Sequence, residues 1–142
     1  MTRSIFVFAM ALFAGLSAGC PGAFERQPPP KTFVSGYVTL DGSAMSHPRG
    51  EISFHTGGEA PVTFPIVDGK FFGEAHVGEC RVEINAWEQG EPIMMNGSPF
   101  GDPVDISVID EEFNVNSQLR ANIPEQGVSD LMFKVHTRGK QD

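Results

Sequence analysis

Apolar and polar residues alternate along most of the chain after residue 33, which is the pattern of half-buried β-strands. The segment 79–88 shows it most clearly, because its charged and amide side chains fall on one face and its apolar ones on the other. The apolar set is Cys80, Val82, Ile84 and Ala86. We therefore expect Cys80 to be a small buried hydrophobic residue and not a reactive thiol, with Trp87 on the polar face.

The same period of two recurs in residues 33–40, 51–56, 62–67, 70–77, 117–123 and 130–136. The expected inward side chains are Val34, Val38, Leu40, Ile52, Phe54, Val62, Phe64, Ile66, Leu119, Ala121, Ile123, Leu131, Phe133 and Val135. Pro65 marks 62–67 as an edge strand, since proline cannot donate to a ladder. Asp-Gly pairs at 41–42 and 68–69 are typical of hairpin turns. The whole pattern predicts an all-β fold, a single seven-stranded β-sandwich.

The first twenty residues have the order of an export signal. Arg3 precedes an apolar run at 5–14, which is shorter than the roughly 20 residues a spanning helix needs. Small residues then lead to Cys20, and this segment resembles a bacterial lipobox. The resemblance implies cleavage after residue 19 and a lipid on Cys20. One position departs from the usual pattern, because Ser17 stands where lipoboxes commonly have leucine. The alternative is ordinary signal cleavage, which would leave a free Cys20 able to pair with Cys80.

We expect four regions: a signal peptide (1–19), a proline-rich tether from Cys20 (20–32), the β-sandwich (33–137) and a short tail (138–142). Three consecutive prolines at 28–30 favour an extended polyproline II tether. The net charge of −8 argues against nucleic-acid binding, because such a domain repels a phosphate backbone. By resemblance to Gram-negative sorting rules, Pro21 favours the outer over the inner membrane.

Residues 33–42 resemble the opening of carboxypeptidase regulatory-like domains, and residues 68–71 and 77–82 are similar to the central hairpin of that family. Asn114, Ser117, Leu119 and the segment 130–133 resemble the end of small bacterial lipoproteins that carry this domain. The resemblance covers about residues 33–136 and implies a transthyretin-like sandwich. It brings no catalytic residues with it, because the family shares none.

The region 88–112 contains seven acidic residues and no lysine or arginine. Oxygen-rich clusters can bind Ca²⁺, which takes six to eight hard ligands, and the weak candidates are Asp102, Asp105 and Asp110. The region lacks an ordered ligand spacing, so a solvated acidic loop is the preferred interpretation. No other metal site and no cofactor is expected besides the covalent lipid on Cys20.

The long loop at 91–100 carries apolar residues that suggest a contact surface. The candidate interaction residues are Trp87, Met94, Met95 and Phe100. In a second arrangement, Ile93, Met95 and Phe100 fold back over the core. Of the two arrangements, we expect this second one.

Catalysis is not indicated, because the four histidines lack zinc-site spacing and no nucleophile with a base is recognisable. We expect a membrane-anchored, exported lipoprotein of the cell envelope, whose sandwich is a non-catalytic structural or protein-interaction module. Its partners would be the membrane, through the lipid, and an envelope protein. The alternative is a carbohydrate- or Ca²⁺-binding module that uses Trp87 and the acidic loop 88–112.

The lipid prediction is tested by the intact mass of the N-terminal peptide from detergent-extracted membranes. We expect a diacylglyceryl-modified Cys20 at the new terminus, and its loss in Cys20→Ala. An unmodified terminus on protein recovered from the soluble fraction would show that the Ser17 departure prevents lipidation.

Overall fold

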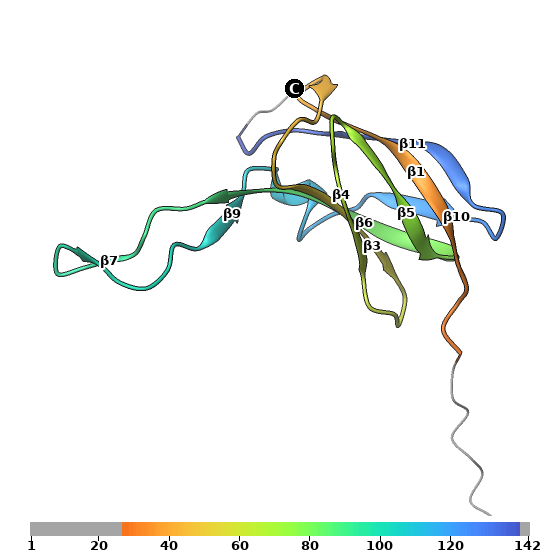
Figure 1. The fold of residues 1–142 in the computed structure, drawn as a ribbon, viewed down its shortest axis with the longest axis horizontal. Helices are drawn as coiled ribbons and strands as arrows, with labels where there is room; N and C mark the ends of the chain where they lie inside the picture. The colour runs from red at the N-terminus through yellow and green to blue at the C-terminus, as the bar shows by residue number, and fades with distance from the viewer. Residues whose placement is uncertain (1–26, 140–142) are drawn as a thin grey trace, which may run out of the picture.

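The structure is a computed structural model that describes residues 27–139. The expected signal peptide, Cys20, most of the expected tether and residues 140–142 lie outside this range. Within it, the chain forms eleven β-strands and one short 3₁₀ helix, with no α-helix (Figure 1). The all-β prediction is therefore confirmed. The described residues include no helix of the length and apolarity needed to cross a bilayer.

The first sheet is built around β1 (Lys31–Leu40). β1 pairs in parallel with β11 (Val128–Val135) on one edge and antiparallel with β5 (Lys70–His76) on the other. The short β2 (Ser43–Ala44) pairs with the end of β1, where β5 has stopped. β1 is thus the central strand of a four-stranded sheet.

The second sheet is antiparallel and follows the order β10-β6-β3-β4. Its strands are β10 (Arg120–Ile123), β6 (Gly78–Gln89), β3 (Gly50–Thr56) and β4 (Val62–Pro65). β9 (Asp105–Ser107) pairs with the last residues of β6. The expected edge position of the strand that contains Pro65 is confirmed, because β4 ends the order.

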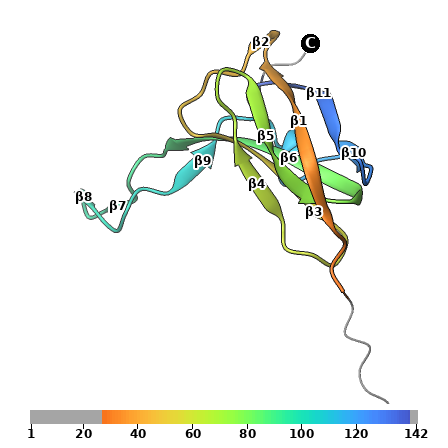
Figure 2. The same cartoon turned by 45° about the vertical axis from the view of Figure 1, so that its right-hand side comes forward.

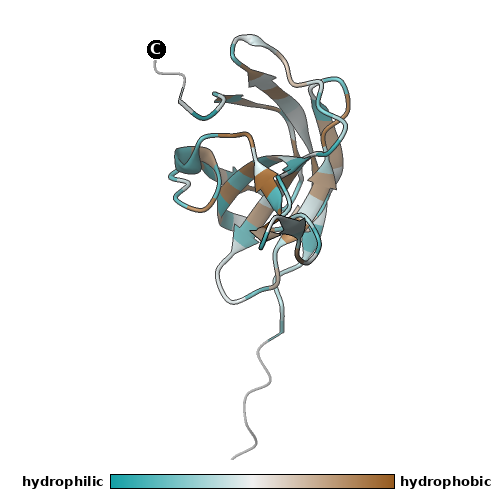
Figure 3. Cartoon of the chain, turned by 90° about the vertical axis from the view of Figure 1, so that its left-hand side faces the viewer, coloured by the Kyte–Doolittle hydropathy of each residue, from teal (hydrophilic) through white to brown (hydrophobic). Residues whose placement is uncertain are grey.

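The core lies between the two sheets, where their apolar faces meet (Figures 2 and 3). Four phenylalanine rings form a chain of contacts from one sheet to the other. Ring centroids are 6.0 Å apart for Phe64–Phe54, 5.8 Å for Phe54–Phe71 and 6.2 Å for Phe71–Phe133. These tilted pairs are a favoured aromatic geometry, so they add attraction to the burial of apolar area.

The alternation in β6 is confirmed, because Cys80, Val82, Ile84 and Ala86 are all buried. Both expected Asp-Gly turns have positive φ angles, at Asp41-Gly42 and Asp68-Gly69. The strand number differs from the seven expected, because β2, β9 and a small hairpin at 94–99 form short ladders inside segments read as turns or loops. Two expected strands are also shorter, since β4 ends at Pro65 and β10 begins only at Arg120.

Gly36 occupies a close contact between β1 and β11. The register between these strands shifts between Val34 and Gly36, where Asp130 adopts φ 63°. A Cβ atom on Gly36 would lie 2.2 Å from the carbonyl oxygen of Leu131 and 2.8 Å from the ring of Phe71. The parallel pairing therefore depends on a residue without a side chain at this point.

We predict that Gly36→Ala destabilises the domain by roughly 1–3 kcal/mol, the usual cost of overpacking, because the opposing carbonyl belongs to a paired strand and cannot rotate away. Gly57→Ala is the matched control, since its Cβ would meet no atom within 4 Å and its change should stay within about 0.5 kcal/mol. Urea unfolding of both variants measures the difference. Equal midpoints would show that the β1–β11 contact is not tight.

Candidate interaction site

Residues 90–104, which we call the arm, extend away from the body of the sandwich (Figure 1). β7 (Met94–Met95) and β8 (Ser98–Pro99) form a two-stranded hairpin at its tip. The turn residues Asn96 and Gly97 have φ of 52° and 80°, the left-handed angles that a tight hairpin turn requires. Phe100 N donates to Ile93 O at 2.7 Å, which continues the pairing toward the body.

The base of the arm is held to the second sheet by a backbone ladder and a paired charge. β6 and β9 pair over three residues, and Gly90 N donates to Val104 O at 2.9 Å. Arg49, just before β3, donates to both carboxylate oxygens of Asp105, at 2.8 and 2.5 Å. These bonds lower the pKa of Asp105 and raise that of Arg49, since each charge favours the other. The pair fixes the direction in which the arm leaves the sheet.

The apolar side chains of the arm are exposed. Relative exposures are 59% for Ile93, 60% for Met94, 54% for Met95 and 59% for Phe100. The expectation that Ile93, Met95 and Phe100 fold back over the core is therefore wrong. The physical reason is the hairpin itself, because it pairs its two strands with each other and directs the tip away from the core. These side chains are free for contact with another molecule.

Trp87 lies on the polar face of β6, as expected, beside the base of the arm. Its Nε1 donates to Glu51 Oε1 on β3 at 2.7 Å, so the polar end of the indole already has a partner. Trp87 also borders two shallow hollows. One of about 350 Å³ includes Arg49, Glu51 and Phe64, and the other of about 250 Å³ includes Asn85, Asp105 and Arg138.

Several other side chains of this polar face contact one another. Ser53 and Thr63 share a hydrogen bond of 2.8 Å across β3 and β4. Glu83 lies 2.9 Å from His55 Nε2 and 2.5 Å from the guanidinium of Arg81. These side chains are therefore engaged with one another, although the buried Nε2 of His55 makes no hydrogen bond.

The three candidate Ca²⁺ ligands have separate surroundings. Asp105 binds Arg49, whereas Asp110 Oδ1 accepts from Glu112 N and caps the 3₁₀ helix η1 (Glu111–Phe113). Asp102 is exposed on the arm. Among residues 27–139, no group of three or more His, Cys, Asp or Glu side chains is placed to hold a metal ion.

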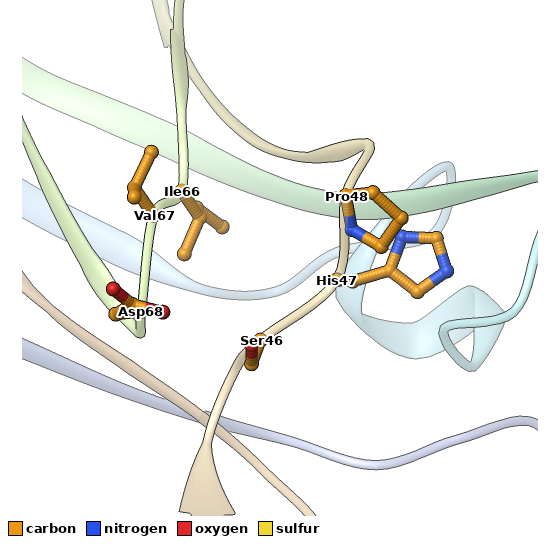
Figure 4. A pocket seen from close by; sticks show the side chains of 6 residues that line it. All are labelled: Ser46, His47, Pro48, Ile66, Val67 and Asp68. Carbon is orange, nitrogen blue, oxygen red and sulfur yellow. The ribbon is translucent and has the colours of Figure 1, made fainter.

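Two further features lack the geometry of a reactive centre. The Cys80 thiol donates to Ala121 O at 3.3 Å, and burial raises its pKa to about 11, so it is a neutral core residue at ordinary pH. A hollow of about 310 Å³ is lined by Ser46, His47, Pro48, Ile66, Val67 and Asp68 (Figure 4). The His47 ring points away from Asp68 there, and its Nε2 lies 3.4 Å from Glu88 Oε1 outside the hollow.

A second exposed apolar surface lies on the outer side of the first sheet, and the sequence analysis did not identify it. We call it the sheet face. Its apolar members are Phe33, Tyr37, Phe72 and Met132, with exposures of 53%, 44%, 72% and 68%. Alternation along β1 could have predicted this surface. Val34 and Val38 point inward, so the odd-numbered aromatic residues beside them point outward.

Comparisons with known proteins add little to this geometry. No protein-family model matches the chain, and no curated protein matches it. Among solved structures, the chain is similar to a DUF3823 family protein from Parabacteroides merdae, with 14% identity and a TM-score of 0.37. The match covers 77% of this chain and 46% of that one, so the chain spans about half the length of that protein.

We predict that Arg49→Gln loosens the base of the arm without unfolding the sandwich, because one of its side-chain anchors is removed while the core is untouched. Hydrogen exchange of the Gly90 amide and the β6–β9 ladder should become faster, and exchange in β1 should not change. Arg81→Gln, in the same sheet but far from the arm, is the control. Unchanged exchange at the β6–β9 ladder in Arg49→Gln would show that backbone pairing alone holds the arm.

Proposed function

We propose that this protein is an exported, membrane-anchored lipoprotein whose sandwich presents the arm to another protein of the cell envelope. The observation that carries the proposal is a hairpin with four apolar side chains, each more than half exposed: Ile93, Met94, Met95 and Phe100. Exposure of apolar side chains to water is unfavourable, and a partner that buried them would remove this cost.

The proposed anchor suits this role. A lipid on Cys20 would keep the chain at a membrane, since two acyl chains give durable attachment. The proline-rich segment 20–32 would act as a spacer, and by the Pro21 resemblance we propose the outer membrane. We also propose that the sandwich is of the transthyretin-like type, because the resemblance of residues 33–42 and 68–82 supports it. In this scheme the sandwich is a rigid support that holds the arm away from the anchor.

The shape of the site favours a protein over a small ligand. Small-molecule sites are concave and enclose most of their ligand, whereas the arm protrudes. The alternative of a carbohydrate or Ca²⁺ module has less support, because Trp87 Nε1 is bound to Glu51 and the carboxylate of Asp105 is bound to Arg49. A non-catalytic role is also supported by the buried, neutral Cys80 and the internally paired face of the second sheet.

A photocrosslinking amino acid placed at Met95 in the intact chain tests the proposal in living cells. We expect a discrete protein adduct on irradiation, because the arm tip would be buried against its partner. The same probe at Val67, which is apolar and 64% exposed but lies outside the arm, is the comparison and should give a different adduct pattern, since Val67 pairs with Lys70 and not with the arm.

The second half of this experiment removes the hydrophobic contact. Met94→Ser together with Phe100→Ser should reduce the adduct strongly, since the partner would lose its apolar anchors. The hairpin turn at Asn96-Gly97 is left intact in this variant. Absence of a Met95 adduct, or an adduct insensitive to the serine variant, would contradict the assignment of the arm as the contact surface.

A further inference from the structure

The sheet face gathers apolar side chains from three strands. Strand register places Tyr37 opposite Met132 on β11, and Phe72 on β5 opposite Ser35 of β1. Phe33 is two residues before Ser35 and therefore points to the same side. Aromatic and methionine side chains thus form one continuous surface across β11, β1 and β5. A monomeric protein rarely leaves such a surface in water without a use for it.

The sheet face is also where the described part of the chain places its lysines. Lys70 pairs in register with Tyr37, and its Nζ lies 5.9 Å from the centre of the Tyr37 ring. Lys134 pairs with Thr39, and Lys31 begins β1 on the same side. Against these three cations the face carries two acids, Glu74 and Asp130. In a protein of net charge −8, this leaves the sheet face apolar and with a small positive net charge.

The arm has the complementary character. It is apolar at its tip, and its ionisable residues are Glu91 and Asp102, with Glu88 and Asp105 at its base. In both views it continues outward from the end of β6, beyond the body formed by the two sheets (Figures 1 and 2). The arm therefore points away from the sheet face of its own molecule, so contact between the two surfaces requires two molecules.

From this complementarity we propose that the arm of one molecule binds the sheet face of a second copy of the same chain. The inference rests on the proposed function, because it names the partner of the arm. Met94, Met95 and Phe100 pack against Phe33, Tyr37, Phe72 and Met132. The acids of the arm face the lysines of the sheet face, which sets the orientation. Because the two surfaces differ, the association is head-to-tail and extends along the membrane or closes into a ring.

The experiment uses the full lipidated chain with the photocrosslinker at Met95, reconstituted alone into phosphatidylcholine vesicles. We expect an adduct of twice the chain mass, with the crosslink mapped by mass spectrometry to peptides of β1, β5 or β11. Phe72→Ala with Met132→Ala should lower the adduct yield at least about tenfold, which corresponds to about 1.4 kcal/mol of lost binding free energy. Val115→Ala, apolar and 70% exposed outside both surfaces, is the control and should leave the yield unchanged.

Charge reversal tests the orientation independently of the apolar contact. Lys70→Glu with Lys134→Glu on the sheet face should weaken self-association, and so should Glu91→Lys with Asp102→Lys on the arm. Mixing these two variants should restore the adduct, because opposite charges again meet across the contact. A mixture that stays as weak as each variant alone would overturn the proposed pairing.

The outcomes separate this inference from the proposed function. A Met95 adduct with a different envelope protein in cells, without any self-adduct in vesicles, would overturn self-association and leave the arm as an interaction element. Crosslinks from Met95 to lipid in the vesicles would also overturn it. Absence of every adduct in both settings would contradict both proposals, whereas a self-adduct mapped to the sheet face supports both.

Discussion

β6 is longer than the core that it crosses, and the rest of the structure depends on this strand. Its twelve residues pair with β10 near the start, with β3 along the middle and with β9 at the end. Residues 80–86 supply apolar side chains to the core, while residues 87–89 continue beyond it. The strand that holds the second sheet together is therefore also the strand from which the arm emerges.

This continuity explains how an exposed hairpin keeps a defined direction. The β6–β9 ladder makes the base of the arm a continuation of the second sheet. The Arg49–Asp105 pair joins this base to the start of β3. Both side chains of that pair are about half exposed, so the pair adds little to the stability of the fold and mainly orients the arm. Rigidity at the base lowers the entropic cost of binding, since little has to be ordered when a partner arrives.

The two outer faces of the sandwich differ in chemistry, since one is mainly polar and the other exposes apolar rings. On the second sheet several polar side chains pair with one another, as in the Trp87–Glu51 and Ser53–Thr63 hydrogen bonds. The first sheet leaves aromatic rings and lysines facing solvent. A polar surface that is already paired gains little from binding, whereas an exposed apolar surface gains from burial. We therefore place recognition on the arm and the sheet face.

Several features of the fold follow from the sequence alone. The buried set in β6 was predictable because side chains alternate along a strand, and the turns at Asp41-Gly42 and Asp68-Gly69 because positive φ angles favour such residues. Both are local properties of a few neighbouring residues. The polar placement of Trp87 was predictable for the same reason. The alternation also put Phe33 and Tyr37 outward, although it did not show what they would meet.

Tertiary structure decided what local patterns could not. Whether Met94, Met95 and Phe100 cover the core or leave it depends on how β6 and β9 pair, and periodicity does not encode that pairing. The sheet face exists because β1 pairs with β11, which lies at the other end of the domain. That parallel pairing brings Met132 beside Tyr37, and β5 brings Phe72 from the opposite edge. Long-range strand pairing is selected by the packing of the whole core, so only the folded chain shows which exposed residues become neighbours.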